Sequence, residues 1–150
     1  MSVTSVRKLS DIAEAIGKGK DARTVLIDAI GADNIENFEP FHNFILIATY
    51  VRSDKTKGGI IIGGDRTRAE DRFQGKIGMV LKVGPTAFKG AKPDSFGGVT
   101  VNVGDWIMYK ASDAHEFFFV DEKSSLDGSS CRLIEDTLIM GRVADPESIF

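Results

Sequence analysis

The stretch Asn43-Phe-Ile-Leu-Ile-Ala-Thr-Tyr-Val51 is rich in β-branched and aromatic residues, and this composition predicts a buried strand. Further runs of the same kind follow it, separated by turn signals such as Val83-Gly-Pro85 and Asp127-Gly128. The later strands are expected at 76–83, 99–101, 105–110, 116–120, 131–134 and 137–143. Short strands at such close intervals predict an all-β sandwich or barrel over residues 40–150.

The segment before this stretch, residues 1–39, has a different spacing of apolar residues, and this spacing predicts helices. Apolar residues recur there at helical spacing on one face: Val6, Leu9, Ile12, Ala13 and Ile16. Asp21 is a candidate N-cap of a second short helix, which Gly31 would end. We therefore expect a helical N-terminal extension, for which two roles are open. It is either a cap packed on its own barrel or a docking arm for another subunit or partner.

The overall composition excludes several classes of protein. Of the 150 residues, 42% are hydrophobic, which is enough for a packed core and argues against global disorder. The net charge of −3 and a pI of about 5.4 argue against nucleic acid as a partner. No apolar run is long enough to span a membrane, and the N-terminus lacks the apolar stretch of a secretory signal. The one cysteine, Cys131, fits a reducing, cytoplasmic location.

The connection from Arg52 to Gly75 is too long to be a turn, and long structureless connections in compact domains are usually functional or disordered. At its centre, Gly58-Gly-Ile-Ile-Ile-Gly-Gly64 places three isoleucines between two glycine pairs. Two interpretations are open: an apolar tripeptide on a flexible tether that binds a partner transiently, or a short inner strand bracketed by glycines. A second long connection, Pro85 to Gly98, predicts a protruding hairpin.

Several segments resemble motifs of the GroES-type co-chaperonins, in the order of that family and near its spacing. Pro40-Phe-His-Asn-Phe-Ile-Leu-Ile47 resembles the opening strand, and Lys57-Gly-Gly-Ile-Ile-Ile62 is similar to the mobile-loop motif of two glycines and an apolar tripeptide. The later segments Gln74-Gly-Lys-Ile-Gly-Met-Val-Leu-Lys-Val-Gly84, Val103-Gly-Asp-Trp-Ile-Met-Tyr109, Leu133-Ile and Thr137-Leu-Ile-Met resemble further strands. The resemblance covers about residues 40–145. The 39 residues before it depart from the family pattern, and such a departure suggests a divergent, bacteriophage-encoded member.

The resemblance implies a mainly β fold, a GroES-like irregular β-barrel, with a mobile loop at about 52–75 and a hairpin at about 85–98. It implies a co-chaperonin that forms a seven-membered homo-oligomeric ring and caps a GroEL-type chaperonin cylinder to assist protein folding. In such rings the first strand of one subunit lies beside the last strand of its neighbour, which would pair 43–51 with 137–143 across the interface. The residues that dock on the chaperonin would be Ile60, Ile61 and Ile62, with Gly58 and Gly59 as hinges.

A structural protein is the alternative. In that interpretation the same barrel forms part of a bacteriophage virion, as a capsid or tail component, and residues 1–39 are its attachment arm. The location would then be the virion and not the cytoplasm of a bacterial or infected cell.

Enzyme chemistry is not favoured by any motif. His42 and His115 lack a metal-ligand pattern, and we interpret His115 as a turn residue and Cys131 as a small core residue. The glycine-rich centre of the long connection lacks the Gly-Lys-Ser/Thr of a P-loop, which argues against nucleotide binding. Glu135 and Asp136 are interpreted as part of a solvated face. We expect no catalytic residue, no metal site and no cofactor.

Overall fold

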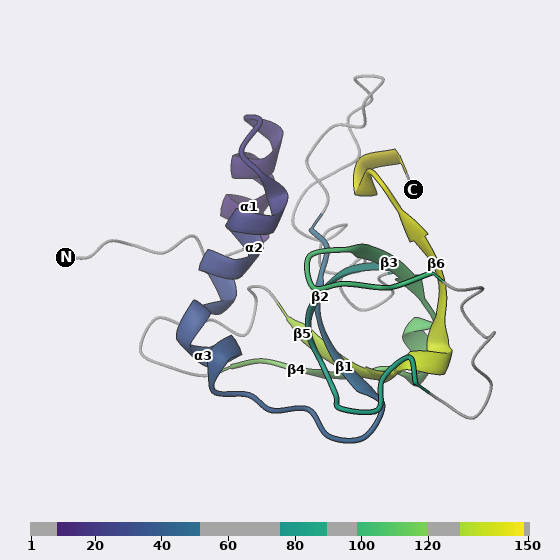
Figure 1. Ribbon diagram of the computed structural model, residues 1–150. Helices are drawn as coiled ribbons and strands as arrows, with labels where there is room; N and C mark the ends of the chain where they lie inside the picture. The colour runs from purple at the N-terminus through teal and green to yellow at the C-terminus, as the bar shows by residue number, and fades with distance from the viewer. Residues whose placement is uncertain (1–8, 52–75, 90–98, 120–129, 149–150) are drawn as a thin grey trace.

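Antiparallel strands form one curved sheet in the computed structural model, which describes residues 9–51, 76–89, 99–119 and 130–148 (Figure 1). In the described residues the strand order is β4-β5-β1-β2-β3-β6. The strands are β1 (Phe44–Thr49), β2 (Ile77–Val83), β3 (Trp106–Tyr109), β4 (His115–Phe117), β5 (Cys131–Glu135) and β6 (Ile139–Val143). The predicted mainly β fold is confirmed.

The strand β1 sends alternate side chains into two separate cores, one on each face of the sheet. Ile45 and Ile47 belong to a cluster inside the curl of the sheet, together with Val80, Ile107, Tyr109 and Ile134. Leu46 and Ala48 belong to a second cluster on the opposite face. Successive side chains of a strand point to opposite faces, so a strand covered on both sides is apolar at every position. This explains the uninterrupted apolar run of β1.

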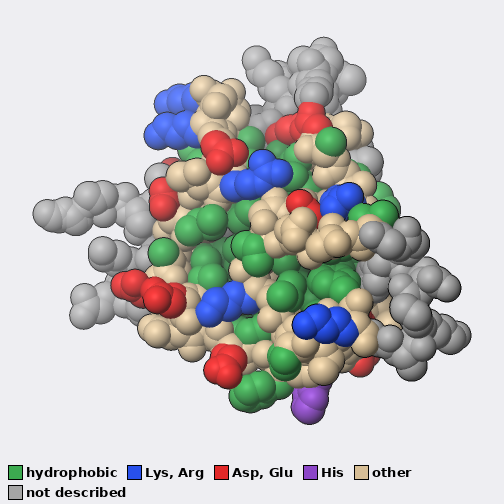
Figure 2. All heavy atoms as spheres, viewed as in Figure 1, with side chains coloured by type: hydrophobic (Ala, Val, Ile, Leu, Met, Phe, Trp, Pro, Cys, Tyr) green, Lys and Arg blue, Asp and Glu red, His purple; other side chains and the backbone are tan. Residues whose placement is uncertain are grey.

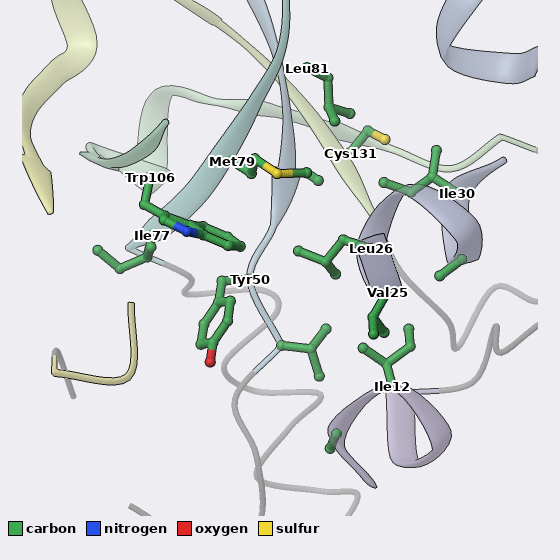
Figure 3. Close-up of a cluster of buried hydrophobic side chains, with 14 of the residues drawn as sticks. Ile12, Val25, Leu26, Ile30, Tyr50, Ile77, Met79, Leu81, Trp106 and Cys131 are labelled. Atoms are coloured by element: carbon green, nitrogen blue, oxygen red, sulfur yellow. The ribbon is translucent and has the colours of Figure 1, made fainter. Parts of the chain in front are cut away.

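Helices cover the second face. The helices are α1 (Leu9–Gly17), α2 (Ala22–Ile30) and α3 (Ala32–Glu36), and they lie together on one side of the sheet (Figure 1). Their buried residues Ile12, Leu26 and Ile30 share one core cluster with Met79 and Trp106 of the sheet (Figure 3). Short isolated helices are marginal in water and need such a docking surface. In this structure the N-terminal helices are a cap packed on their own sheet.

Glycines end the first two helices, as the sequence predicts. Gly19 and Gly31 have φ angles of 88° and 99°, in the left-handed region that favours glycine. The Gly31 N–H donates to the Ile27 carbonyl at 2.8 Å and closes α2. Asp21 occupies the N-cap position of α2, but its side chain makes no capping hydrogen bond to the backbone. Among the helices of the described part, none is long and apolar enough to cross a membrane.

Three of the predicted strands differ from the observed ones. Residues 99–101 are not a strand. The Thr100 carbonyl accepts a hydrogen bond from Arg142 Nη1 at 2.8 Å, so the arginine side chain takes the place that the backbone N–H of a neighbouring strand would have. The strand expected at 116–120 is the shorter β4, and it begins at His115, which is therefore not a turn residue. The strand expected at 137–143 is β6, and it is preceded by the 3-10 helix η2 (Asp136–Leu138). Two further 3-10 helices are η1 (Ala111–Asp113) and η3 (Pro146–Ser148).

Asp136 is buried, which contradicts its interpretation as part of a solvated face. Only 5% of the residue is exposed. Its carboxylate accepts hydrogen bonds from Asn43 Nδ2 at 2.8 Å and from the Phe88 N–H at 2.7 Å, and its own N–H donates to the Asn43 carbonyl. Phe88 has a φ of 64°, a conformation rare for a bulky residue. Asp136 therefore ties the start of β1 to the turn after β2, and burial is tolerated because each carboxylate oxygen accepts a hydrogen bond.

The expected pairing of 43–51 with the last strand of a neighbour is wrong. One edge of β1 pairs with β2 and the other edge pairs with β5, both within the same chain. No hydrogen-bonding edge of β1 is left for another subunit. By contrast, the edge of β6 away from β3 has no strand partner among the described residues.

Gly84 is a position where the fold leaves no room for a side chain. A Cβ atom there would lie 2.3 Å from the His42 carbonyl oxygen and 2.9 Å from that of Phe44. We expect Gly84→Ala to lower the free energy of unfolding by about 2–3 kcal/mol, because the backbone must move to relieve the clash. The matched control is Gly141→Ala, since a Cβ at Gly141 meets nothing within 4 Å. Urea unfolding of both variants tests this, and equal midpoints would contradict it.

Leu26 tests whether the N-terminal helices fold with the sheet. Its side chain is fully buried in the shared core, so Leu26→Ala should lower the free energy of unfolding by about 2–5 kcal/mol. The exposed Asp28 lies on the same helix, and Asp28→Ala should change the value by no more than about 0.5 kcal/mol. Helical circular dichroism and the fluorescence of Trp106 should report one common transition. An unchanged Trp106 transition in Leu26→Ala would show that the helices fold separately.

Candidate partner-binding site

The predicted docking residues lie outside the described residues: Gly58, Gly59, Ile60, Ile61 and Ile62. What the structure describes is the attachment of their segment. Residues 52–75 connect β1 to β2, which are neighbours in the sheet. The two ends of the segment are therefore joined to adjacent, hydrogen-bonded strands.

At the point where residues 52–75 join the sheet, the backbones of β1 and β2 are hydrogen-bonded to each other and the last side chains before the segment are buried. Thr49 pairs with Gly78 in the last step of the β1–β2 ladder, and the Tyr50 N–H donates to the Ile77 carbonyl at 3.1 Å. Tyr50 and Val51 are both buried in the core that the helices share. The hydrogen bonds and the burial fix the chain up to Val51.

Tyr50 links this attachment point to β3 and to the C-terminal part of the chain. Its ring packs edge-on against Trp106, with 5.2 Å between the ring centroids (Figure 3). Its hydroxyl donates a hydrogen bond to Glu147 Oε1 of η3. Trp106 in turn pairs with Val143 of β6. A buried aromatic pair with a satisfied hydroxyl holds one orientation, so Tyr50 anchors the segment on this side.

A buried polar cluster holds the other side of the attachment point. The Ser130 hydroxyl donates to Glu116 Oε2 at 2.9 Å, and its oxygen lies 3.1 Å from Thr49 Oγ1. The Thr49 N–H donates to the Ser130 carbonyl. The guanidinium of Arg132, almost completely buried, lies 3.5 Å from Glu116 Oε2. These contacts join the end of β1 to the start of β5 and to β4.

Arg132 places its charge inside the curled sheet. Its guanidinium carbon lies 5.8 Å from the ring centre of Tyr109. Burial raises the pKa of the Tyr109 hydroxyl, while the positive charge of Arg132 acts in the opposite direction. Sequence reasoning missed this cluster. Arg132 itself is the signal that could have revealed the cluster. It occupies an inward-facing position of β5 and pairs with Ile47 in the ladder.

Among the described titratable groups, the cysteine is buried and both histidines are exposed. Burial raises the pKa of the Cys131 thiol to about 12, so at neutral pH the thiol is protonated and not nucleophilic. Its position confirms the prediction of a core residue. His42 and His115 are exposed on separate elements. Among the described residues, no group of three His, Cys, Asp or Glu side chains is placed to hold a metal ion.

Exposed apolar side chains mark two surfaces suited to protein contacts. The β6 surface comprises Val99 and Met140, which is 65% exposed. It borders a cavity of about 560 Å³ beside the edge of β6 that has no strand partner among the described residues. The end surface comprises Phe41, which is 63% exposed, and Val83. Large exposed apolar side chains that gather in patches are typical of protein interfaces.

A family comparison identifies the fold independently of these observations. The family model described as "Chaperonin 10 Kd subunit" matches residues 37–141. The match runs from just before β1 into β6 and includes residues 52–75, and it begins after α3. A search of curated proteins found no match. Because the match spans more than half of the 150 residues, the chain belongs to the chaperonin 10 Kd subunit family, the GroES-type co-chaperonins.

Proposed function

We propose that this protein caps a GroEL-type chaperonin cylinder and assists protein folding, and that it docks through Ile60, Ile61 and Ile62 with Gly58 and Gly59 as hinges. Partnership with a chaperonin and assembly into rings are general features of its family, whose members are not enzymes. The observation that carries the proposal is the attachment of residues 52–75. The segment with the apolar tripeptide joins two neighbouring strands whose ends are buried and anchored by Tyr50.

The energetics favour weak docking by each copy and tight docking by an assembly. Burying three isoleucines contributes roughly 5–9 kcal/mol before costs. Ordering a free loop costs about 2–5 kcal/mol or more, so one loop should bind weakly. Several loops held by one ring raise the effective concentration, which supplies affinity while each contact stays reversible. This suits a cap that must bind and leave in each cycle.

Ring assembly needs two different surfaces on each subunit, because a closed ring is built from head-to-tail contacts. We assign the β6 surface as one of them, since it combines exposed Met140 with a strand edge that has no partner among the described residues. We assign the end surface around Phe41 as the other. Seven subunits are expected, as in the family. We also expect the protein in the cytoplasm of a bacterial or infected cell.

The proposed docking residues can be tested by replacing them with negatively charged residues. The double variant Ile60→Asp, Ile61→Asp should lose binding to a bacterial chaperonin in the presence of nucleotide, because carboxylates cannot enter an apolar groove. The loss of two buried isoleucines alone should weaken each contact by about 100-fold or more. The control, Thr56→Asp with Thr67→Asp, adds the same charge to the same segment and should bind like the parent. Both are measured by co-sedimentation with the chaperonin, and wild-type binding by the isoleucine variant would overturn the docking assignment.

The ring surfaces are tested by mixing variants. The parent should have a mass of about seven times 16.3 kDa, while Phe41→Asp and Met140→Asp should each be monomeric. An equimolar mixture still contains one intact pair of surfaces, so it should form heterodimers of about twice 16.3 kDa and no rings. Native mass spectrometry distinguishes these species. Rings in either variant alone, or rings restored in the mixture, would contradict the assignment.

A further inference from the structure

A groove lies at one margin of the contact between the N-terminal helices and the sheet, and two cationic side chains bridge the helices and the sheet there. The Arg23 Nε–H donates to the Gly104 carbonyl at 2.6 Å, which joins α2 to the turn before β3. Lys82 Nζ donates to the carbonyls of Glu36 and Phe38 at 2.7 and 2.9 Å, which joins β2 to the end of α3. Between these bridges lies a cavity of about 340 Å³ that is open to solvent on one side.

The walls of the groove are almost entirely apolar. Ile27, Ala32 and Ile35 line it from α2 and α3, and the buried side chains of Met79 and Leu81 form its floor on β2. Val103 stands at its lip with 62% of the residue exposed. Figure 2 shows hydrophobic side chains gathered on this face, with Lys and Arg side chains among them. An apolar cleft of this size, with a few polar groups at its edges, is typical of a ligand site.

The bridging cations keep hydrogen-bond donors for a ligand. The Arg23 guanidinium has five N–H donors and uses one on Gly104, and it lies 5.4 Å from the ring centre of Trp106, which fixes its position. Lys82 has three donors and uses two. Among the lining residues, Glu36 is the one carboxylate against two cations. The groove therefore complements a ligand with an apolar body and negative charge.

We propose that this groove binds a short apolar peptide segment that carries acidic side chains. The apolar side chains fill the groove, and a carboxylate pairs with the Nη groups of Arg23. On the open side of the groove, the backbone N–H and C=O groups of a bound peptide can hydrogen-bond to water, whereas a bound alkyl chain would leave apolar surface exposed to water. A peptide therefore suits the groove better than an alkyl chain does. The family match begins at residue 37, so the α2 and α3 walls lie outside it and the match does not assign this groove.

Peptide binding is measured on the whole protein with the acetylated and amidated probe Glu-Leu-Ile-Leu-Glu. Trp106 is the one tryptophan and contacts Arg23, so its emission should change saturably with this probe. The probe with both Glu replaced by Lys should bind about tenfold or more weakly, because its charges oppose Arg23. The probe with Ser in place of the apolar residues should not bind. Equal binding of the acidic and basic probes, or no binding at millimolar concentration, would overturn the proposal.

Substitutions locate the site, with isothermal titration calorimetry as the readout. Val103→Asp at the exposed lip should weaken binding of the acidic probe by about tenfold or more. Ser112→Asp is the matched control, since Ser112 is exposed on η1 outside the groove, and it should bind like the parent. Unchanged binding in Val103→Asp would show that the groove is not the site. If decanoate bound with the same dependence on Val103 and the peptide did not, the groove would be a lipid site and the peptide proposal would be wrong.

The test is independent of chaperonin docking. The variant Ile60→Asp, Ile61→Asp leaves the groove residues unchanged, so it should bind the acidic probe with the affinity of the parent. A loss of peptide binding in that variant would place the peptide at the docking segment and overturn the groove assignment.

Discussion

The structure depends on the two apolar faces of β1. Because Ile45 and Ile47 point into the curl of the sheet while Leu46 and Ala48 point out of it, neither face can be left to solvent. The curl of the sheet covers the first face. The N-terminal helices cover the second, and each aliphatic side chain that they bury contributes roughly 1.5–3 kcal/mol. The N-terminal helices, for which the sequence left a docking arm open, therefore contribute to the core of this protein.

This arrangement also gives a firm framework to the segment that we propose to bind a partner. Residues 52–75 leave the sheet between its two most buried strands, and Tyr50 and the cluster around Ser130 hold the chain on either side of that point. The charges of Arg132 and Glu116 are tolerated there because they are paired and hydrogen-bonded. The strands at both ends of this segment belong to one ladder, which fixes the two points where the segment joins the sheet.

The added helices create a surface as well as a core. The bridges from Arg23 and Lys82 join the helices to the sheet beside their shared core, and an apolar groove lies at that margin, near the single tryptophan. Under the proposed function, such a groove would give the protein a second contact, with an apolar, acidic segment.

The sequence by itself determined the positions of β1, β2 and β3, the ends of the first two helices and the family, because apolar β-branched runs, glycines and short motifs are local signals. It located β1, β2 and β3 closely, and it marked Gly31 as a helix end. It missed α3, which is too short to show a period, and it assigned Asp136 to solvent because a carboxylate beside a glutamate usually lies there. Only the tertiary structure decided that Asp136 is buried between Asn43 and Phe88, and that both edges of β1 are used within one chain. Those outcomes depend on contacts between residues far apart in the chain, and no local pattern encodes such contacts.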